Sequence, residues 1–157
     1  MDYLQVDFRD KALFLKLFGE DVYAVGGFIR DYLRKDPSED VDILILKHPV
    51  EEIVAKLKPH GRVDLVGKSF GVIKFTREGK TYDIALPRID QPKETRQRTH
   101  KDFKIITDPH LPLERDLSRR DFRCNSIALR LADGRLFDPF HGRADIDKKI
   151  LRMTNPE

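Results

Sequence analysis

The stretch AVGGFIRDYLRKDPSEDVDILIL, residues Ala24–Leu46, decides the fold of this chain. It starts inside a short apolar run, Val22–Val25, of the kind that forms a strand. The pair Gly26-Gly27 then allows the backbone to turn sharply and to approach a ligand closely, because neither residue carries a Cβ atom. The segment Phe28–Leu33, which follows the turn, is predicted to be a helix.

This corner between strand and helix is suited to binding phosphate. The first N–H groups of a helix have no intrahelical partners and lie at the positive end of the helix dipole. Arg30, one turn into the predicted helix, adds a guanidinium group whose fork matches phosphate oxygens. A Gly-Gly pair before a helix is also common as a simple tight connection, so the turn alone does not establish a phosphate site.

Two carboxylates begin the next predicted strand, Val41–Leu46. Side chains alternate along a strand, so Asp40 and Asp42 should point to one face and the apolar residues to the other. Two neighbouring acids repel each other unless a cation lies between them, and Mg²⁺ is a hard ion that prefers carboxylates together with substrate phosphates. The alternative is a solvated acidic start to the strand. Because the glycine turn and the carboxylates fall on consecutive elements, we favour a joint phosphate and metal site.

A third acid lies in a predicted hairpin, formed by Val72–Phe75 and Thr81–Leu86. Asp83 is in the middle of its second strand, where a carboxylate is costly without a partner. If that strand lies beside the strand of Asp42, Asp83 becomes the third carboxylate of a metal site; the competing interpretation is an ion pair with a lysine or arginine. The loop Gly67–Gly71 has two glycines but leads into a strand and not a helix, so we favour a simple connecting loop over a phosphate site.

The stretch LERDLSRRDFRCN, Leu113–Asn125, is the second informative segment. The paired arginines Arg119 and Arg120 stand beside two acids, Asp116 and Asp121. This pattern indicates that carboxylates fix the arginine forks, which then contact phosphate.

Other segments are predicted from their patterns without any assigned chemistry. Amphipathic helices are expected at Asp7–Phe18 and Pro49–Lys58, and a short helix at Arg143–Ile150. Further strands are expected at Arg62–Val66, Ser126–Leu131 and Leu136–Asp138.

The segment 89–107 is strongly basic and shows no apolar period. We expect a long loop near the active face that contacts an RNA backbone, although a simply solvated charge run has the same composition. Its basic residues are Lys93, Arg96, Arg98, His100, Lys101 and Lys104.

Composition bounds the class of protein. The chain has 157 residues, 36% of them charged, a net charge of +3 and a pI near 9.0, which favours one domain and permits a polyanionic partner. The single cysteine, Cys124, excludes an intrachain disulfide and a cysteine-built zinc site. We find no apolar run long enough to cross a bilayer and no signal-peptide pattern, so a cytoplasmic protein without membrane association is expected.

Five motifs taken together, in order VGGFIRD, DVDI, YDIALPR, DLSRRDFRCNSIAL and LFDPFHGRADI, resemble the catalytic head of the class II tRNA nucleotidyltransferase and bacterial poly(A) polymerase family. The resemblance covers nearly the whole chain. It implies an α+β fold, the nucleotidyltransferase palm, with a mixed, mainly antiparallel sheet of about five strands and helices on one face. Residues 1–157 would then form one head domain.

The resemblance also implies roles for ten residues. Three carboxylates would be catalytic and would hold two Mg²⁺ ions, for which Mn²⁺ can substitute: Asp40, Asp42 and Asp83. The triphosphate would be held by Gly26, Gly27 and Arg30. Arg120 would contact the nucleotide, supported by Arg119, Asp121 and Asn125.

The implied reaction is template-independent transfer of AMP or CMP from ATP or CTP to the 3′-hydroxyl of tRNA or another RNA, with release of pyrophosphate. Two alternatives stay open: a transferase of the same fold that modifies a protein or small-molecule hydroxyl, and a non-catalytic RNA-binding module. The sequence does not distinguish A-, CC- and CCA-adding from poly(A)-adding activity, and it leaves the oligomeric state unknown.

The sequence departs from the family pattern in two places. Relatives often have a Leu-Gly-Arg-Pro-type turn after the helix, whereas this chain has Leu33-Arg34-Lys35-Asp36-Pro37. The family also continues with an E-D-x-x-R motif that selects the base and with helical neck, body and tail domains. These are absent up to Glu157, so we expect a head that needs further domains for full activity.

Overall fold

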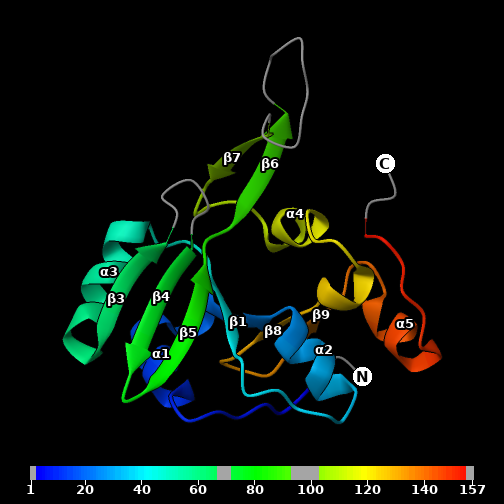
Figure 1. Cartoon of the computed structure of the whole chain (residues 1–157), viewed down its shortest axis with the longest axis horizontal. Helices are drawn as coiled ribbons and strands as arrows, with labels where there is room; N and C mark the ends of the chain where they lie inside the picture. The colour runs from blue at the N-terminus through cyan, green and yellow to red at the C-terminus, as the bar shows by residue number, and fades with distance from the viewer. Residues whose placement is uncertain (1–2, 67–71, 93–102, 155–157) are drawn as a thin grey trace.

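The protein forms a seven-stranded sheet in the order β3-β4-β5-β2-β1-β8-β9, with helices packed against it (Figure 1). The structure is a computed structural model that describes residues 3–66, 72–92 and 103–154. The strands of this sheet are β1 (Val22–Val25), β2 (Asp42–Ile45), β3 (Arg62–Val66), β4 (Val72–Arg77), β5 (Lys80–Ala85), β8 (Ala128–Arg130) and β9 (Leu136–Phe137). The helices are α1 (Lys11–Phe18), α2 (Gly27–Leu33), α3 (Val50–Leu57), α4 (Leu113–Ser118) and α5 (Gly142–Lys148).

The sheet is mixed and mainly antiparallel. β2 and β5 run parallel, whereas the other neighbouring pairs are antiparallel. The predicted α+β palm is therefore confirmed, with seven strands in place of about five. The lower number came from the family resemblance, whereas the residue patterns themselves predict seven strands. In the structure, the C-terminal hairpin of β8 and β9 extends the sheet beyond β1.

Alternation along the central strands gives the sheet two different faces. On β1 and β2, Val22, Ala24, Ile43 and Ile45 belong to the larger core, where buried aromatic and aliphatic residues of α1, α2 and α3 pack. The residues between them on the same strands turn to the opposite face, where they form a smaller cluster with Leu117 of α4. Asp42 follows this second alternation, so its carboxylate lies on the α4 face.

Two further strands replace the irregular loop predicted over 89–107. β6 (Arg88–Pro92) and β7 (Phe103–Thr107) pair as an antiparallel ribbon that projects from the sheet (Figure 1). The prediction of a loop was wrong at both ends of the segment 89–107, because we weighed its charge density above the β-branched residues in Phe103–Thr107. The basic centre, 93–102, and the predicted loop at 67–71 lie outside the described residues.

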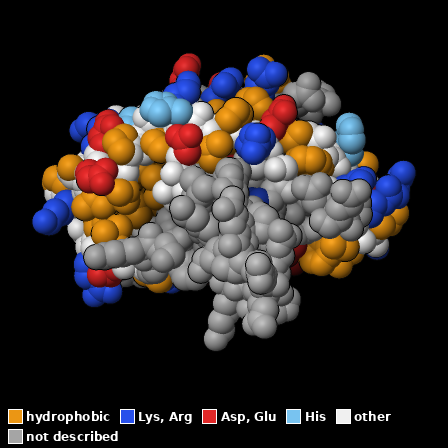
Figure 2. All heavy atoms as spheres, turned by 90° about the horizontal axis from the view of Figure 1, so that it is seen from above, with side chains coloured by type: hydrophobic (Ala, Val, Ile, Leu, Met, Phe, Trp, Pro, Cys, Tyr) orange, Lys and Arg blue, Asp and Glu red, His pale blue; other side chains and the backbone are white. Residues whose placement is uncertain are grey.

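The surface carries charges of both signs among apolar side chains. Figure 2 shows the end from which β6 and β7 project, with apolar side chains gathered on the side of α3 and β3. Leu65 and Val66 of β3 are 54% and 43% exposed. No helix among the described residues is long and apolar enough to cross a membrane.

Candidate active site

Asp42 and Asp83 face each other across the parallel pair of β2 and β5. They are directly paired in register, as the sequence analysis anticipated for a shared site. Residues at the same level of neighbouring strands point to the same face, so both carboxylates lie on the α4 face of the sheet. Asp40 is exposed, two residues before Asp42, and its backbone N–H donates to Ser38 Oγ at 3.1 Å.

Asp42 is the acid most affected by this arrangement. Burial raises its pKa to about 6, and the charge of Asp83, followed by that of Asp40, acts in the same direction. Arg120 and Arg30 oppose the rise, because their positive charges favour the ionised carboxylate. A buried acid beside other acids is the situation that a cation would relieve.

The three carboxylates do not form a finished metal site. Among the described residues, no group of three or more histidine, cysteine or acidic side chains has the arrangement of a metal centre. Asp83 instead lies 3.5 Å from Lys74 Nζ, so the lysine pairing considered from sequence is present together with the neighbouring Asp42. The donor chemistry still fits a hard divalent ion, since the facing carboxylates supply oxygen ligands and the charges of Asp83 and Asp40 add to the effect of burial in raising the Asp42 pKa.

The glycine turn brings the backbone against this acid. Gly26 has φ +67°, a conformation that side-chain-bearing residues rarely adopt. A Cβ atom on Gly26 would lie 3.4 Å from Arg120 Nη1 and 3.6 Å from Asp42 Oδ2. The turn, an arginine and a carboxylate from three separate segments therefore meet at one point.

Asp116 holds the two predicted arginines. This carboxylate is fully buried and accepts hydrogen bonds from Arg119 Nε at 3.1 Å and Arg120 Nη2 at 3.3 Å. It also accepts the backbone N–H of Arg88 at 3.0 Å, where β6 begins. Burial lowers the pKa of Arg120, an effect that Asp116 opposes. The predicted fixing of arginine forks by an acid is thus present, with Asp116 serving both arginines.

A cavity of about 350 Å³ opens at this meeting point. Its lining consists of Gly26, Gly27, Asp42, Arg88, Arg119, Arg120, Asp121 and Asn125, which we call the Gly26 pocket. Seven of these eight residues were predicted from sequence. The exception, Arg88, stands in the motif YDIALPR but received no role there; its position directly after a strand that carries a candidate metal ligand is the signal that was missed.

Three predicted residues do not line the Gly26 pocket: Asp40, Asp83 and Arg30. Arg30 pairs with Asp31 at 2.9 Å, and its Nη1 donates to Asn125 Oδ1 at 2.9 Å. Asn125 in turn donates from Nδ2 to Asp121 at 3.2 Å. Arg30 is therefore linked to the Gly26 pocket through Asn125.

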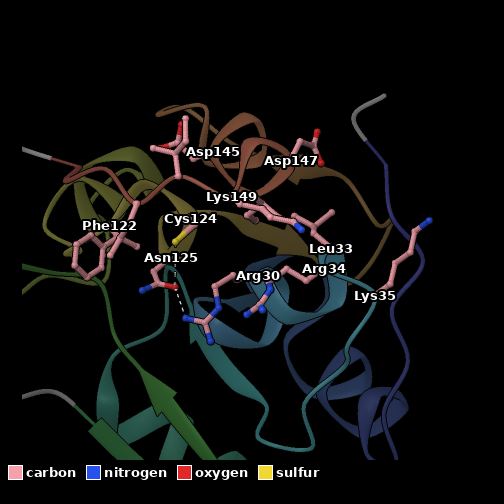
Figure 3. A pocket seen from close by; sticks show the side chains of 13 residues that line it. Arg30, Leu33, Arg34, Lys35, Phe122, Cys124, Asn125, Asp145, Asp147 and Lys149 are labelled. Carbon is pink, nitrogen blue, oxygen red and sulfur yellow. Dashed lines mark hydrogen bonds between the residues drawn. The ribbon is translucent and has the colours of Figure 1, made fainter.

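Arg30 lines a second, larger cavity of about 850 Å³ between α2 and α5 (Figure 3). Figure 3 shows its guanidinium directed toward Asn125, with Arg34 directly after the end of α2. Asn125 lines both cavities, so it stands at their boundary. The basic residues 93–102, predicted to contact RNA, lie outside the described residues.

Comparison with known proteins identifies the family. The family model described as the poly(A) polymerase head domain matches residues 22–152. The chain belongs to this family. Poly(A) polymerase head domains are nucleotidyltransferase domains, a class that typically uses divalent metal ions.

Relatives of this head domain include CCA-adding enzymes. The multifunctional CCA protein of Xanthomonas euvesicatoria is 36% identical over 86% of the chain, which covers 30% of that protein. Among solved structures, the Bacillus stearothermophilus CCA-adding enzyme in complex with CTP aligns with a TM-score of 0.67 and 31% identity, over 93% of this chain and 33% of that one. The Thermotoga maritima CCA-adding enzyme complexed with tRNA aligns with a TM-score of 0.68 and 26% identity, over 96% and 34%. This head domain thus spans about a third of the length of these relatives.

Proposed function

We propose that this head domain transfers a nucleotide from CTP or ATP to the 3′-hydroxyl of tRNA and releases pyrophosphate. The observation that carries the proposal is the meeting of three groups on the wall of a pocket that Arg119 also lines. A Cβ atom on Gly26 would lie 3.4 Å from Arg120 Nη1 and 3.6 Å from Asp42 Oδ2. A triphosphate needs fixed positive charge and an open backbone, and its metal ions need carboxylates; all three are supplied here.

Each group in the pocket has a distinct task in this proposal. Arg119 and Arg120 bind phosphate oxygens, with their forks held by Asp116. Gly26 leaves room for phosphate beside the backbone. Asp42 and Asp83, together with Asp40, would hold the divalent ions, whose chemistry when bound would be activation of the attacking oxygen and stabilisation of charge on the transferring phosphoryl group.

The two substrates are proposed from the relatives. Solved CCA-adding enzymes of similar fold are complexes with CTP and with tRNA, so these are the partners we propose for this chain. Because the chain spans about a third of such proteins, we propose that further helical domains hold tRNA and select the base. Mg²⁺ as the natural ion, residues 1–157 as one head domain and a cytoplasmic location remain predictions of the same kind.

The test is incorporation of labelled CTP or ATP into tRNA that lacks its 3′ end. We expect Mg²⁺-dependent transfer by the 157-residue chain that falls at least about a hundredfold in Asp42→Ala. Glu51→Gln, which removes an exposed acid from α3 on the other face of the sheet, is the matched control and should keep the wild-type rate. Label on a protein or small molecule in place of RNA, or transfer that persists in Asp42→Ala, would contradict the proposal.

A further inference from the structure

A row of four charged side chains, one lysine among three aspartates, crosses four strands on the α4 face of the sheet. Asp64 of β3, Lys74 of β4, Asp83 of β5 and Asp42 of β2 are consecutive register partners. Side chains at one level of neighbouring strands point to the same face, so Lys74 stands directly next to the candidate metal ligands. The sequence analysis gave Lys74 no role.

Lys74 pairs with Asp83, one of the two candidate metal ligands in this row. Its Nζ lies 3.5 Å from Asp83 Oδ1, and the two side chains are 46% and 52% exposed. On its other side, Asp64 already pairs with Arg62 Nε at 2.9 Å. The positive charge of Lys74 therefore acts on Asp83 in the absence of metal.

We propose that Lys74 is the built-in counter-ion of Asp83, that it competes there with the divalent cation, and that it thereby sets the cation affinity of the site. The inference rests on the proposed function, since it requires Asp42 and Asp83 to bind metal. Lys74 is not itself a ligand, because an ammonium group has no acceptor for a metal ion. It acts on the metal through Asp83.

The direction of the effect follows from the charges. Without Lys74, Asp83 and Asp42 face each other with less compensation, so the metal-free protein is destabilised and a cation gains more by binding. An exposed ion pair of this kind is worth about 0.2–1 kcal/mol. Removing it should tighten Mn²⁺ binding about 1.4- to fivefold.

The experiment measures Mn²⁺ binding by the decrease of the free-ion EPR signal, in wild type, in three lysine variants and in Asp42→Asn. Lys74→Met removes the charge with little change of length, and Lys74→Arg keeps it. Lys16→Met removes an exposed lysine from α1, which packs on the opposite face, and serves as control. We expect tighter binding in Lys74→Met alone, with Lys74→Arg and Lys16→Met equal to wild type.

A second readout distinguishes an effect of Lys74 on cation affinity from a simple loss of packing. The rise in denaturant midpoint on adding Mn²⁺ should be larger in Lys74→Met than in wild type. Unchanged or weaker Mn²⁺ binding in Lys74→Met, while Asp42→Asn abolishes binding, would overturn the role of Lys74 and leave the metal site intact. Mn²⁺ binding that is absent in every form, or indifferent to Asp42→Asn, would overturn the proposed function as well.

Discussion

Asp42 is the residue on which the proposed chemistry depends most. Among the residues that the structure describes, it is the one acid that both lines the Gly26 pocket and faces a second carboxylate across the sheet. Its pKa of about 6 lies above the ordinary value of 3.8, so the folded protein holds its proton more tightly than the unfolded chain does. Folding stability should therefore fall as pH rises through this interval, because the charged form is disfavoured in the folded state.

The raised pKa of Asp42 predicts how the stability of Asp42→Asn compares with that of wild type in metal-free buffer. Above about pH 6 the variant should be more stable than wild type, by the order of 1 kcal/mol after allowing for solvent screening of a partly exposed group. The difference should shrink toward pH 4, where the wild-type carboxyl is protonated in the folded state. Urea denaturation at several pH values measures it. Equal stability at neutral pH would show that the acid is not strained.

Asp116 should act on nucleotide binding without touching the nucleotide. Asp116→Asn keeps the shape but removes the charge that binds Arg119 and Arg120. We expect about tenfold weaker triphosphate binding, because the arginine forks lose their fixed orientation, and a stability loss of about 1–3 kcal/mol. Fluorescence titration with a labelled triphosphate, beside denaturation, measures both. Wild-type affinity in a folded variant would contradict this role.

At the scale of single residues, the sequence predicted most of the pocket. Motif residues such as Gly26, Arg120 and Asn125 do line it. Arg88 was missed because its position after the predicted strand of Asp83 was not used as a signal for the site. The link of Arg30 to the Gly26 pocket runs through its hydrogen bond to Asn125, 95 positions away, and such pairings become visible only after folding.

At the scale of elements, the turn between β1 and α2 is the feature in which the site tolerates no change. Gly26→Ala would place a methyl group against Arg120 and Asp42 in a backbone conformation with φ +67°. We expect a stability cost of about 1–3 kcal/mol from the backbone alone, and weaker nucleotide binding because the methyl group occupies the pocket. Gly19→Ala, with φ +56° but no atom within 4 Å of the added group, is the matched control. Loss of binding in both variants would mean that strain, not occupancy, is responsible.

Elements with regular alternation were predicted well, and the ribbon was not. The strand Val22–Val25 was predicted with its observed ends, and Asp42–Ile45 to within one residue. The ribbon of β6 and β7 escaped prediction because its two strands are separated by ten intervening residues, 93–102, whose charge was weighed above the β-branched residues of Phe103–Thr107. Helix α2 has only seven residues, so the arginines contribute more to a phosphate site than its dipole does.

At the scale of the whole molecule, the parallel pairing of β2 and β5 joins two halves of the chain into one site. The pairing sets Asp83 beside Asp42, and β1 sets Gly26 on the other side of Asp42. Sequence patterns predicted β1, β2 and β5 individually. The pairing of β2 with β5 was stated only as a condition for Asp83 to become a metal ligand. The solved relatives span about three times the length of this head domain, so the pocket is one part of a larger assembly in those proteins.

The most direct test of the account is a calorimetric titration of CTP into the 157-residue chain, with and without Mg²⁺. We predict binding that requires Mg²⁺, that disappears in Asp42→Asn and that is retained in Glu51→Gln. Binding of equal strength without Mg²⁺, or binding that is unchanged in Asp42→Asn, would contradict the claim that the carboxylates and the Gly26 pocket form a metal-dependent triphosphate site.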